Sequence, residues 1–385
     1  MSNFQSTFLF TLPTRIVFGP GCLKTLPEAL KALKAAHPLI VTDKGVAAAG
    51  ILDKALAHLE GKEKYVVFDG IEANPKDVNV AEGAKAYSSS GADSIVAIGG
   101  GSPIDCAKAI GVLAANGASD IKAFEGKNAP SKPLPPLVVV PTTAGTGSEL
   151  TFSSVITDTK NKYKMTIKNA HTAPKTAVCD PDLTLTVPAD ITAATGMDAL
   201  THAIEAFTAT CAEPISDALA LYAVELINGN IVKAFKDGGN LEARSNMLMG
   251  SMLAGIAFSH SDVASVHCIA EALGGMYDLP HGVCNAIFLP HVMEYNMGDC
   301  LEGYARIAKA MGLSFPSERA GAVAAVMAVQ ELAKNVKLPS FASLNVKEED
   351  YSAIAAAAAK NISSASNPRK MGESDYMEVL KMALR

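Results

Sequence analysis

The sequence predicts an α/β domain at the N-terminus followed by an all-α domain at the C-terminus. Three observations carry this prediction. Short, unbroken apolar runs in the first half alternate with helical stretches, as in βαβ units. Loops rich in glycine and hydroxyl side chains directly follow two of these runs. After about residue 186, β-branched runs disappear and nearly every segment is rich in Ala, Leu and Met with helical periodicity.

Composition excludes several classes of protein. The 385 residues, 49% hydrophobic and 19% charged, suggest two domains with a sizeable core and exclude intrinsic disorder. A net charge of -6 without a long Lys/Arg run argues against nucleic-acid partners and an anionic membrane surface. We expect neither a secretory signal nor a membrane span, which needs an apolar run of ~18 residues. Seven scattered cysteines without a CxxC pair indicate reduced thiols and a cytoplasmic location.

The α/β domain is expected over residues 1–186. Helical spacing marks the segments between the predicted strands, and a hairpin is expected to flank the sheet. An exposed N-terminal strand at 8–18 would be able to pair between subunits, so we expect a homodimer or higher homo-oligomer. The predicted parallel strands are 39–42, 65–68, 94–98 and 137–140, the helical segments 75–90 and 103–113, and the hairpin strands 154–157 and 165–168.

The helical domain is expected over residues 187–385. Pro188 and Asp190 stand where its first helix would begin, with Asp190 as the N-cap. The Ala-rich stretches 322–329 and 354–360 are composed of good helix formers.

A glycine loop follows the predicted strand that ends at residue 98; it consists of Gly99, Gly100, Gly101 and Ser102. Glycines let backbone N–H groups approach a pyrophosphate, and the next helix offers its positive N-terminal end. Ser102 and Asp105 have the spacing of a capping box, with Pro103 suited to the first helical position. An ordinary strand-to-helix turn is the alternative, since the loop matches neither GxGxxG nor a Walker A motif.

A second loop, residues 141–149, follows the strand at 137–140. It offers Thr142, Thr143, Thr146 and Ser148 as hydroxyl groups for phosphate, ribose or an adenine edge. Ligands of open α/β sheets bind at this carboxyl edge of the strands. A polar loop with helix caps is the alternative here, but two such loops together favour nucleotide binding.

Asp43 follows the first predicted strand. Its carboxylate could accept hydrogen bonds from ribose hydroxyls and would repel a 2′-phosphate, which favours NAD over NADP. A helix-capping aspartate is the alternative. Because this acidic residue precedes the glycine loop, the architecture is not the ordinary Rossmann one.

Four residues form a candidate divalent-metal site: Asp198, His202, His267 and His281. Asp198 and His202 are i and i+4 on one helix and share a face. His267 lies on a helix expected to be capped near 261–262 and to end at 274–275, and His281 opens the next segment. One carboxylate and three imidazoles suit a divalent ion with room for a substrate oxygen, whereas core histidines are the alternative.

Other polar residues nearby have several possible roles. Glu205, i+3 from His202, could orient that imidazole or form a solvated salt bridge. His260 and His291 are interpreted as capping or surface residues.

Several long motifs resemble the iron-containing (group III) alcohol dehydrogenases, which include lactaldehyde reductases and propanediol dehydrogenases. The similarity runs from residue 13 to residue 369, nearly the whole chain. Its most specific parts are Gly99–Ser102 with Asp105 and Lys108, then 141–149, 196–205 and 280–286.

The resemblance implies an NAD-binding α/β domain, a helical metal-binding domain, and particular site residues. It makes the four candidate ligands the family's metal ligands and Asp43 its ribose-binding acid. Asn74 resembles a cofactor-contacting asparagine, and Lys164 and Leu183 resemble residues along the cofactor. Iron (Fe²⁺) follows from the resemblance alone, since His/Asp ligation by itself favours Zn²⁺ on affinity grounds.

Two positions depart from the family pattern. Ser153 stands where relatives often have Asn, and Glu271 stands where many have a second histidine, one turn after His267. We expect Glu271 to be catalytic by relaying a proton between substrate oxygen and solvent. A weak additional metal ligand and a helix-surface carboxylate are the alternatives.

The expected function is that of an NAD- and metal-dependent alcohol dehydrogenase or aldehyde reductase. It would act on small primary alcohols or diols by hydride transfer, with the metal as a Lewis acid and His267 among its ligands. One alternative is a polyol oxidoreductase similar to glycerol dehydrogenase. Another is a lyase similar to dehydroquinate synthase, which should carry a Lys/Arg cluster beside the metal ligands, where this chain is apolar. A non-catalytic binding protein is disfavoured because all four ligand residues are present.

Overall fold

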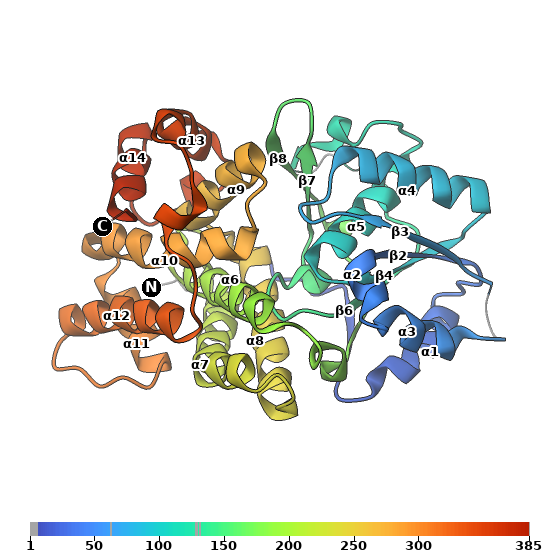
Figure 1. The fold of residues 1–385 in the computed structure, drawn as a ribbon, viewed down its shortest axis with the longest axis horizontal. Helices are drawn as coiled ribbons and strands as arrows, with labels where there is room; N and C mark the ends of the chain where they lie inside the picture. The colour runs from blue at the N-terminus through green and yellow to red at the C-terminus, as the bar shows by residue number, and fades with distance from the viewer. Residues whose placement is uncertain (1–6, 62–63, 128–129, 131, 385) are drawn as a thin grey trace. The chain divides into compact units, whose positions relative to one another are not determined.

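The computed structural model describes residues 7–61, 64–127, 130 and 132–384, and it divides into two compact units (Figure 1). The α/β unit comprises residues 12–143 and 147–187, and the helical unit comprises residues 144–146 and those from Pro188 on. Residues 7–11 also belong to the helical unit, where Phe10 stacks on His260 with ring centroids 4.0 Å apart. The segment 144–146 belongs to the helical unit because Gly145 lies against Thr195. The predicted division at residues 186 and 187 did not anticipate these two short segments.

A six-stranded parallel sheet, in the order β1-β9-β6-β4-β2-β3, forms the centre of the α/β unit. The central strands β4 and β6 are buried along their whole length, which explains their unbroken apolar runs. All four predicted strands are confirmed, whereas only the end of the predicted 8–18 strand is a strand. The bounds are β1 (Arg15–Phe18), β2 (Pro38–Asp43), β3 (Val66–Ile71), β4 (Ser94–Gly99), β6 (Leu137–Pro141) and β9 (Thr176–Cys179).

A smaller sheet holds the predicted hairpin. The antiparallel strands β7 (Ser153–Asp158) and β8 (Tyr163–Lys168) confirm it, and the two-residue β5 (Gly126–Lys127) pairs with β8 in parallel. The helices of the α/β unit are α1 (Leu26–Ala32), α2 (Lys44–Ala48), α3 (Ile51–Leu59), α4 (Asp77–Ser90) and α5 (Gly101–Asn116).

The predicted cap of α5 is wrong. Gly100 is the N-cap, without a side-chain hydrogen bond, and Ser102 already lies inside the helix. Asp105 does not reach back to the helix start, because its carboxylate accepts hydrogen bonds from the hydroxyl of Ser148 and the N–H of Val155.

The helical unit is built around one large apolar core. The Ala-rich predictions are confirmed as parts of α12 and α13. Its helices are α6 (Ala189–Thr208), α7 (Pro214–Lys236), α8 (Leu241–Ser261), α9 (Ser265–Tyr277), α10 (His281–Asn296), α11 (Leu301–Ala310), α12 (Glu318–Asn335), α13 (Tyr351–Lys360) and α14 (Glu373–Met382).

Two helix starts in this unit differ from the prediction. Pro188 is the N-cap of α6, and Asp190 lies in the first turn. Asp262 ends α8 with a left-handed φ of 71°, so α9 begins only at Ser265 and runs on to Tyr277. Neither α6 nor α9 has a side-chain cap from its own N-cap residue.

By length and composition alone, α7 is apolar enough to cross a membrane. In this structure it packs against α6 and α8 and buries Ala220, Val224, Ile227 and Ile231 in the apolar core. That packing is typical of a core helix.

Candidate metal centre

The helical unit brings all four predicted metal ligands together. Asp198 and His202 lie one turn apart on α6, His267 lies in the first turn of α9, and His281 begins α10. Each offers one ligand atom, and these atoms all lie within 4.8 Å of one another. Asp198, His202 and His267 are buried, and His281 is partly exposed. We call these four residues the metal cluster.

The donor set of the metal cluster fits a divalent ion. Burial lowers the pKa of His202 to about 4, so its ring is neutral at pH 7. Its Nδ1 is buried 3.9 Å from Asp198 Oδ2 and has no hydrogen-bond partner among the described residues. Burial opposes ionisation of Asp198, but the three imidazoles and the Asn285 amide lower its pKa below the usual value. A carboxylate with neutral imidazoles is a donor set for Fe²⁺ or Zn²⁺.

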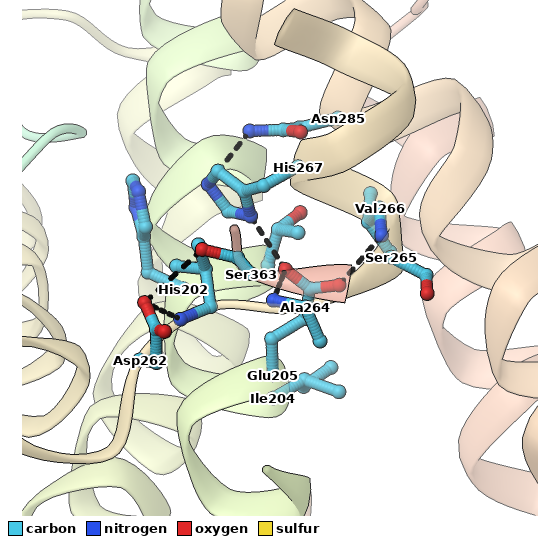
Figure 2. A network of polar contacts seen from close by, with 12 residues as sticks. His202, Ile204, Glu205, Asp262, Ala264, Ser265, Val266, His267, Asn285 and Ser363 are labelled. Atoms are coloured by element: carbon cyan, nitrogen blue, oxygen red, sulfur yellow. Dashed lines mark hydrogen bonds and ion pairs between the residues drawn. The ribbon is translucent and has the colours of Figure 1, made fainter. Parts of the chain in front are cut away.

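Glu205 orients one of these imidazoles, and its partner is His267 rather than His202. The buried carboxylate accepts a hydrogen bond from His267 Nδ1 at 2.5 Å and from the N–H groups of Ala264 and Val266 at 2.9 and 2.7 Å (Figure 2). Burial alone would lower the pKa of His267, but Glu205 raises it. With Nδ1 holding the proton, Nε2 of His267 keeps a lone pair that can bind an ion or accept a hydrogen bond.

Asn285 is a site residue that sequence reasoning missed. It lies one turn after His281 on α10, and its Nδ2 is 2.6 Å from Asp198 Oδ1 and 3.1 Å from Nε2 of both His267 and His281. An amide has two hydrogens for these three acceptors, while its buried Oδ1 has no partner within the described chain. Its donation to Asp198 orients that carboxylate. The i+4 spacing from His281 was the available signal.

Glu271 lies one turn after His267 on α9 and is outside the metal cluster. It is partly buried, and its Oε2 accepts a hydrogen bond from Asn361 Nδ2 at 2.6 Å. Its catalytic role stays a prediction. His260 is also outside the cluster, because its ring bonds to Ile256 and Thr11.

In the α/β unit, the two predicted phosphate-binding loops touch. The N–H of Thr142 donates to the carbonyl of Gly99 at 3.0 Å, and a Cβ on Gly100 would stand 3.0 Å from Thr143 Oγ1. Gly101 and Ser102 form the first turn of α5, whose N-cap provides no side-chain partner. This uncapped helix start offers N–H groups and a positive dipole end to a phosphate.

The other predicted cofactor residues lie along the same unit. Asp43 ends β2 and caps α2 by accepting a hydrogen bond from the N–H of Val46 at 2.8 Å, so the capping role is realised. Asn74 has a left-handed φ of 51° and accepts a hydrogen bond from Lys164 Nζ at 2.7 Å. Leu183 is buried in the apolar core of this unit.

Thr146 and Ser148, the other two hydroxyl residues of the second loop, are placed differently from Thr142 and Thr143. Ser148 is buried, and its hydroxyl donates to Asp105 and lies 3.2 Å from Lys108 Nζ. Thr146 belongs to the 144–146 segment of the helical unit. In the α/β unit, Thr142 and Thr143 therefore contact the glycine loop, whereas the Ser148 hydroxyl points into the interior of the unit.

Comparison with known proteins identifies the family. Family models described as iron-containing alcohol dehydrogenase and as the C-terminal part of the Fe-containing alcohol dehydrogenase family match residues 13–181 and 192–384. The chain is 43% identical over 382 residues to 1,3-propanediol dehydrogenase of Citrobacter freundii, covering 98% of each protein. It is 37% identical over 374 residues to lactaldehyde reductase of Escherichia coli, covering 95% of this chain and 97% of that one.

A solved structure with the same fold contains the cofactor that we expect. Sulfoacetaldehyde reductase from Bifidobacterium kashiwanohense in complex with NAD+ superposes with a TM-score of 0.87 at 27% identity, over 98% of this chain and 99% of that one. The chain therefore belongs to the iron-containing alcohol dehydrogenases, a family of metal-dependent alcohol and aldehyde oxidoreductases.

Proposed function

We propose that this protein interconverts small primary alcohols or diols with the corresponding aldehydes, using NAD and one iron ion. The observation that carries the proposal is the metal cluster, in which three helices bring one carboxylate and three imidazoles together. The relatives named for 1,3-propanediol and for lactaldehyde support a short, oxygenated substrate. The NAD+ complex of a structural neighbour supports the cofactor.

The chain's own residues prepare both binding sites. When bound, the ion supplies a Lewis acid for the substrate oxygen, and NAD accepts or returns the hydride. Asp198 brings one negative charge, and Glu205 holds the tautomer of His267 that presents Nε2. The glycine loop and the start of α5 offer N–H groups to the pyrophosphate, and Asp43 offers a carboxylate to the ribose.

The proposal is tested with anaerobically purified protein. Iron content is measured alongside the oxidation of NADH and NADPH by a panel of short aldehydes. We expect about one iron per chain and far faster oxidation of NADH. Failure to oxidise either cofactor at full metal occupancy would contradict the proposal, and a strict preference for glycerol in the reverse direction would favour a polyol oxidoreductase.

We also propose that the protein is a homo-oligomer. Phe8 and Leu9 are 43% and 81% exposed near the N-terminus, and a second copy would bury these apolar side chains. Light scattering of the unmodified protein and of Leu9→Asp tests this, and a monomeric mass for the unmodified protein would refute it.

A cytoplasmic location is the last part of the proposal. All seven cysteines are free thiols, and this supports a reducing compartment such as the cytoplasm. Fractionation of the producing cell tests the location, and recovery of the protein outside the cytoplasm would refute it.

A further inference from the structure

Lys108, in the middle of α5, is fully buried and binds the end of the second loop and the residues that follow it. Its Nζ donates to the carbonyls of Ser148 and Ser153, both at 2.7 Å, and to the hydroxyl of Thr151 at 2.9 Å. The Thr151 carbonyl and the Ser148 hydroxyl lie at 3.2 Å. An ammonium group has three hydrogens, and the three shortest contacts use them all. The ammonium thus supplies donors to two carbonyl groups that converge on one point.

Asp105, one turn before Lys108 on α5, forms hydrogen bonds to the same segment, residues 148–155. One of its carboxylate oxygens accepts the Ser148 hydroxyl, and the other accepts the N–H of Val155 at 3.0 Å. Its backbone carbonyl accepts the hydroxyl of Ser154 at 2.7 Å. We call Lys108, Asp105 and the residues that they bind the Lys108 cage.

The cage is charged although it is buried. Burial lowers the pKa of Lys108 to about 8, against the opposing effect of Asp105 and Glu149, so the ammonium predominates at pH 7. Removing the buried ammonium group would leave its acceptors without hydrogen bonds. An apolar side chain at position 108 could not hold the carbonyl groups of Ser148 and Ser153 in place. The cage therefore fixes the path of the backbone at residues 148–155 relative to α5.

Both phosphate-binding loops are attached to this cage. α5 begins within the glycine loop, and Ser148, which Lys108 and Asp105 both bind, belongs to the second loop, residues 141–149. We propose that Lys108 is a positioning residue for the dinucleotide, because it holds the glycine loop and the second loop at the separation that the pyrophosphate needs. This inference rests on the proposed function, in which NAD binds at these two loops.

The test replaces Lys108 with an uncharged side chain of similar length, Lys108→Met. We expect the Kd for NADH, measured by fluorescence titration, to rise ~10- to 100-fold, since displaced binding groups lose that much. KM for NAD should rise more than kcat falls, and the iron content should not change. Hydrogen exchange of residues 148–155 should accelerate in the absence of cofactor.

Leu113→Ala is the matched control, because Leu113 is buried on the same helix, five residues beyond Lys108 and outside the cage. It should lower Tm while leaving the NADH Kd unchanged. Equal increases of Kd in both variants would reduce Lys108 to a general stabilising residue, and an unchanged Kd in Lys108→Met would overturn the inference. If Lys108→Met does not fold, Thr151→Val must produce a smaller rise in Kd with unchanged iron, and no rise would overturn the inference.

A failure of the proposed function is distinguishable from a failure of this inference. If the unmodified protein binds neither NADH nor NADPH, the cofactor proposal fails, and the positioning role fails with it even where the exchange data confirm the cage. If the unmodified protein binds NADH and Lys108→Met binds it equally well, only the inference fails.

Discussion

The Lys108 cage and the metal cluster are both buried and charged, but they differ in how completely the protein satisfies them. Every hydrogen of the Lys108 ammonium has an acceptor from the chain. In the metal cluster, His202 Nδ1 and the adjacent Asn285 Oδ1 are buried with no hydrogen-bond partner among the residues that the structure describes. Buried polar groups are normally paired, so the first arrangement is complete as a structural element, whereas the second has lone pairs to spare for an ion.

The two sites also differ in how they are assembled. The cage joins one helix to carbonyl, N–H and hydroxyl groups of a single segment. The metal cluster collects side chains from three helices, and Glu205 and Asn285 orient two of them. Damage to one site should therefore leave the other intact, and each of the following changes tests that independence.

The largest expected effect comes from His267→Ala. Removing one of four donors should abolish bound iron and lower kcat/KM by about 10³-fold or more, because the Lewis acid is lost. NADH binding should persist, since the cage and the loops are untouched. Metal analysis and fluorescence titration of one preparation check both, and full iron occupancy would exclude His267 as a ligand.

Glu271→Gln separates proton transfer from metal binding. If Glu271 relays a proton, kcat should fall ~10- to 1000-fold and the pH–rate profile should change, while iron and NAD binding stay intact. Asn361→Ala is the control, because it removes the hydrogen bond to Glu271 and leaves the carboxylate. Unchanged kcat and pH profile in Glu271→Gln would make this residue a surface carboxylate, and loss of iron would make it a ligand.

Glu205→Gln tests whether the hydrogen bond from His267 to Glu205 strengthens metal binding. Gln keeps the size of the side chain but loses the charge and one of the two oxygens that accept three N–H groups. We expect iron affinity to fall ~10- to 100-fold, as is usual when a partner of a metal-bound histidine is removed. Competition with a chelator measures this, and unchanged affinity would limit Glu205 to capping α9.

The smallest effect is expected at Asp43, in cofactor selectivity. The unmodified protein should prefer NADH, and Asp43→Gly should narrow the gap in kcat/KM by roughly 10-fold or more, since like charges no longer repel the 2′-phosphate. Asp43→Asn retains an oxygen that can accept the N–H of Val46, so it removes the negative charge but keeps the helix cap. This variant therefore shows which of the two effects sets the cofactor preference. Equal kcat/KM for the two cofactors in the unmodified protein would defeat the assignment.

Local patterns predicted the strands and the pair Asp198 and His202. Both the periodicity of apolar residues and the i+4 spacing of two side chains can be recognised within a few residues of sequence. The four metal ligands were predicted as one site, but other contacts between distant segments did not follow from the sequence. Glu205 binds His267, 62 residues away, and Lys108 binds carbonyl groups 40 and 45 residues away, which carry no side-chain signature. The expected cap at Asp190 failed because the N-cap lies two residues earlier, at Pro188, so that α6 begins at Ala189.

We propose that catalysis depends on one iron ion held by Asp198, His202, His267 and His281. The direct measurement is anaerobic titration of chelator-treated protein with Fe²⁺, following bound iron and NADH-dependent aldehyde reduction together. We expect activity to rise in proportion to bound iron and to saturate at one ion per chain. Full activity in the iron-free protein, or iron binding that restores none, would contradict it.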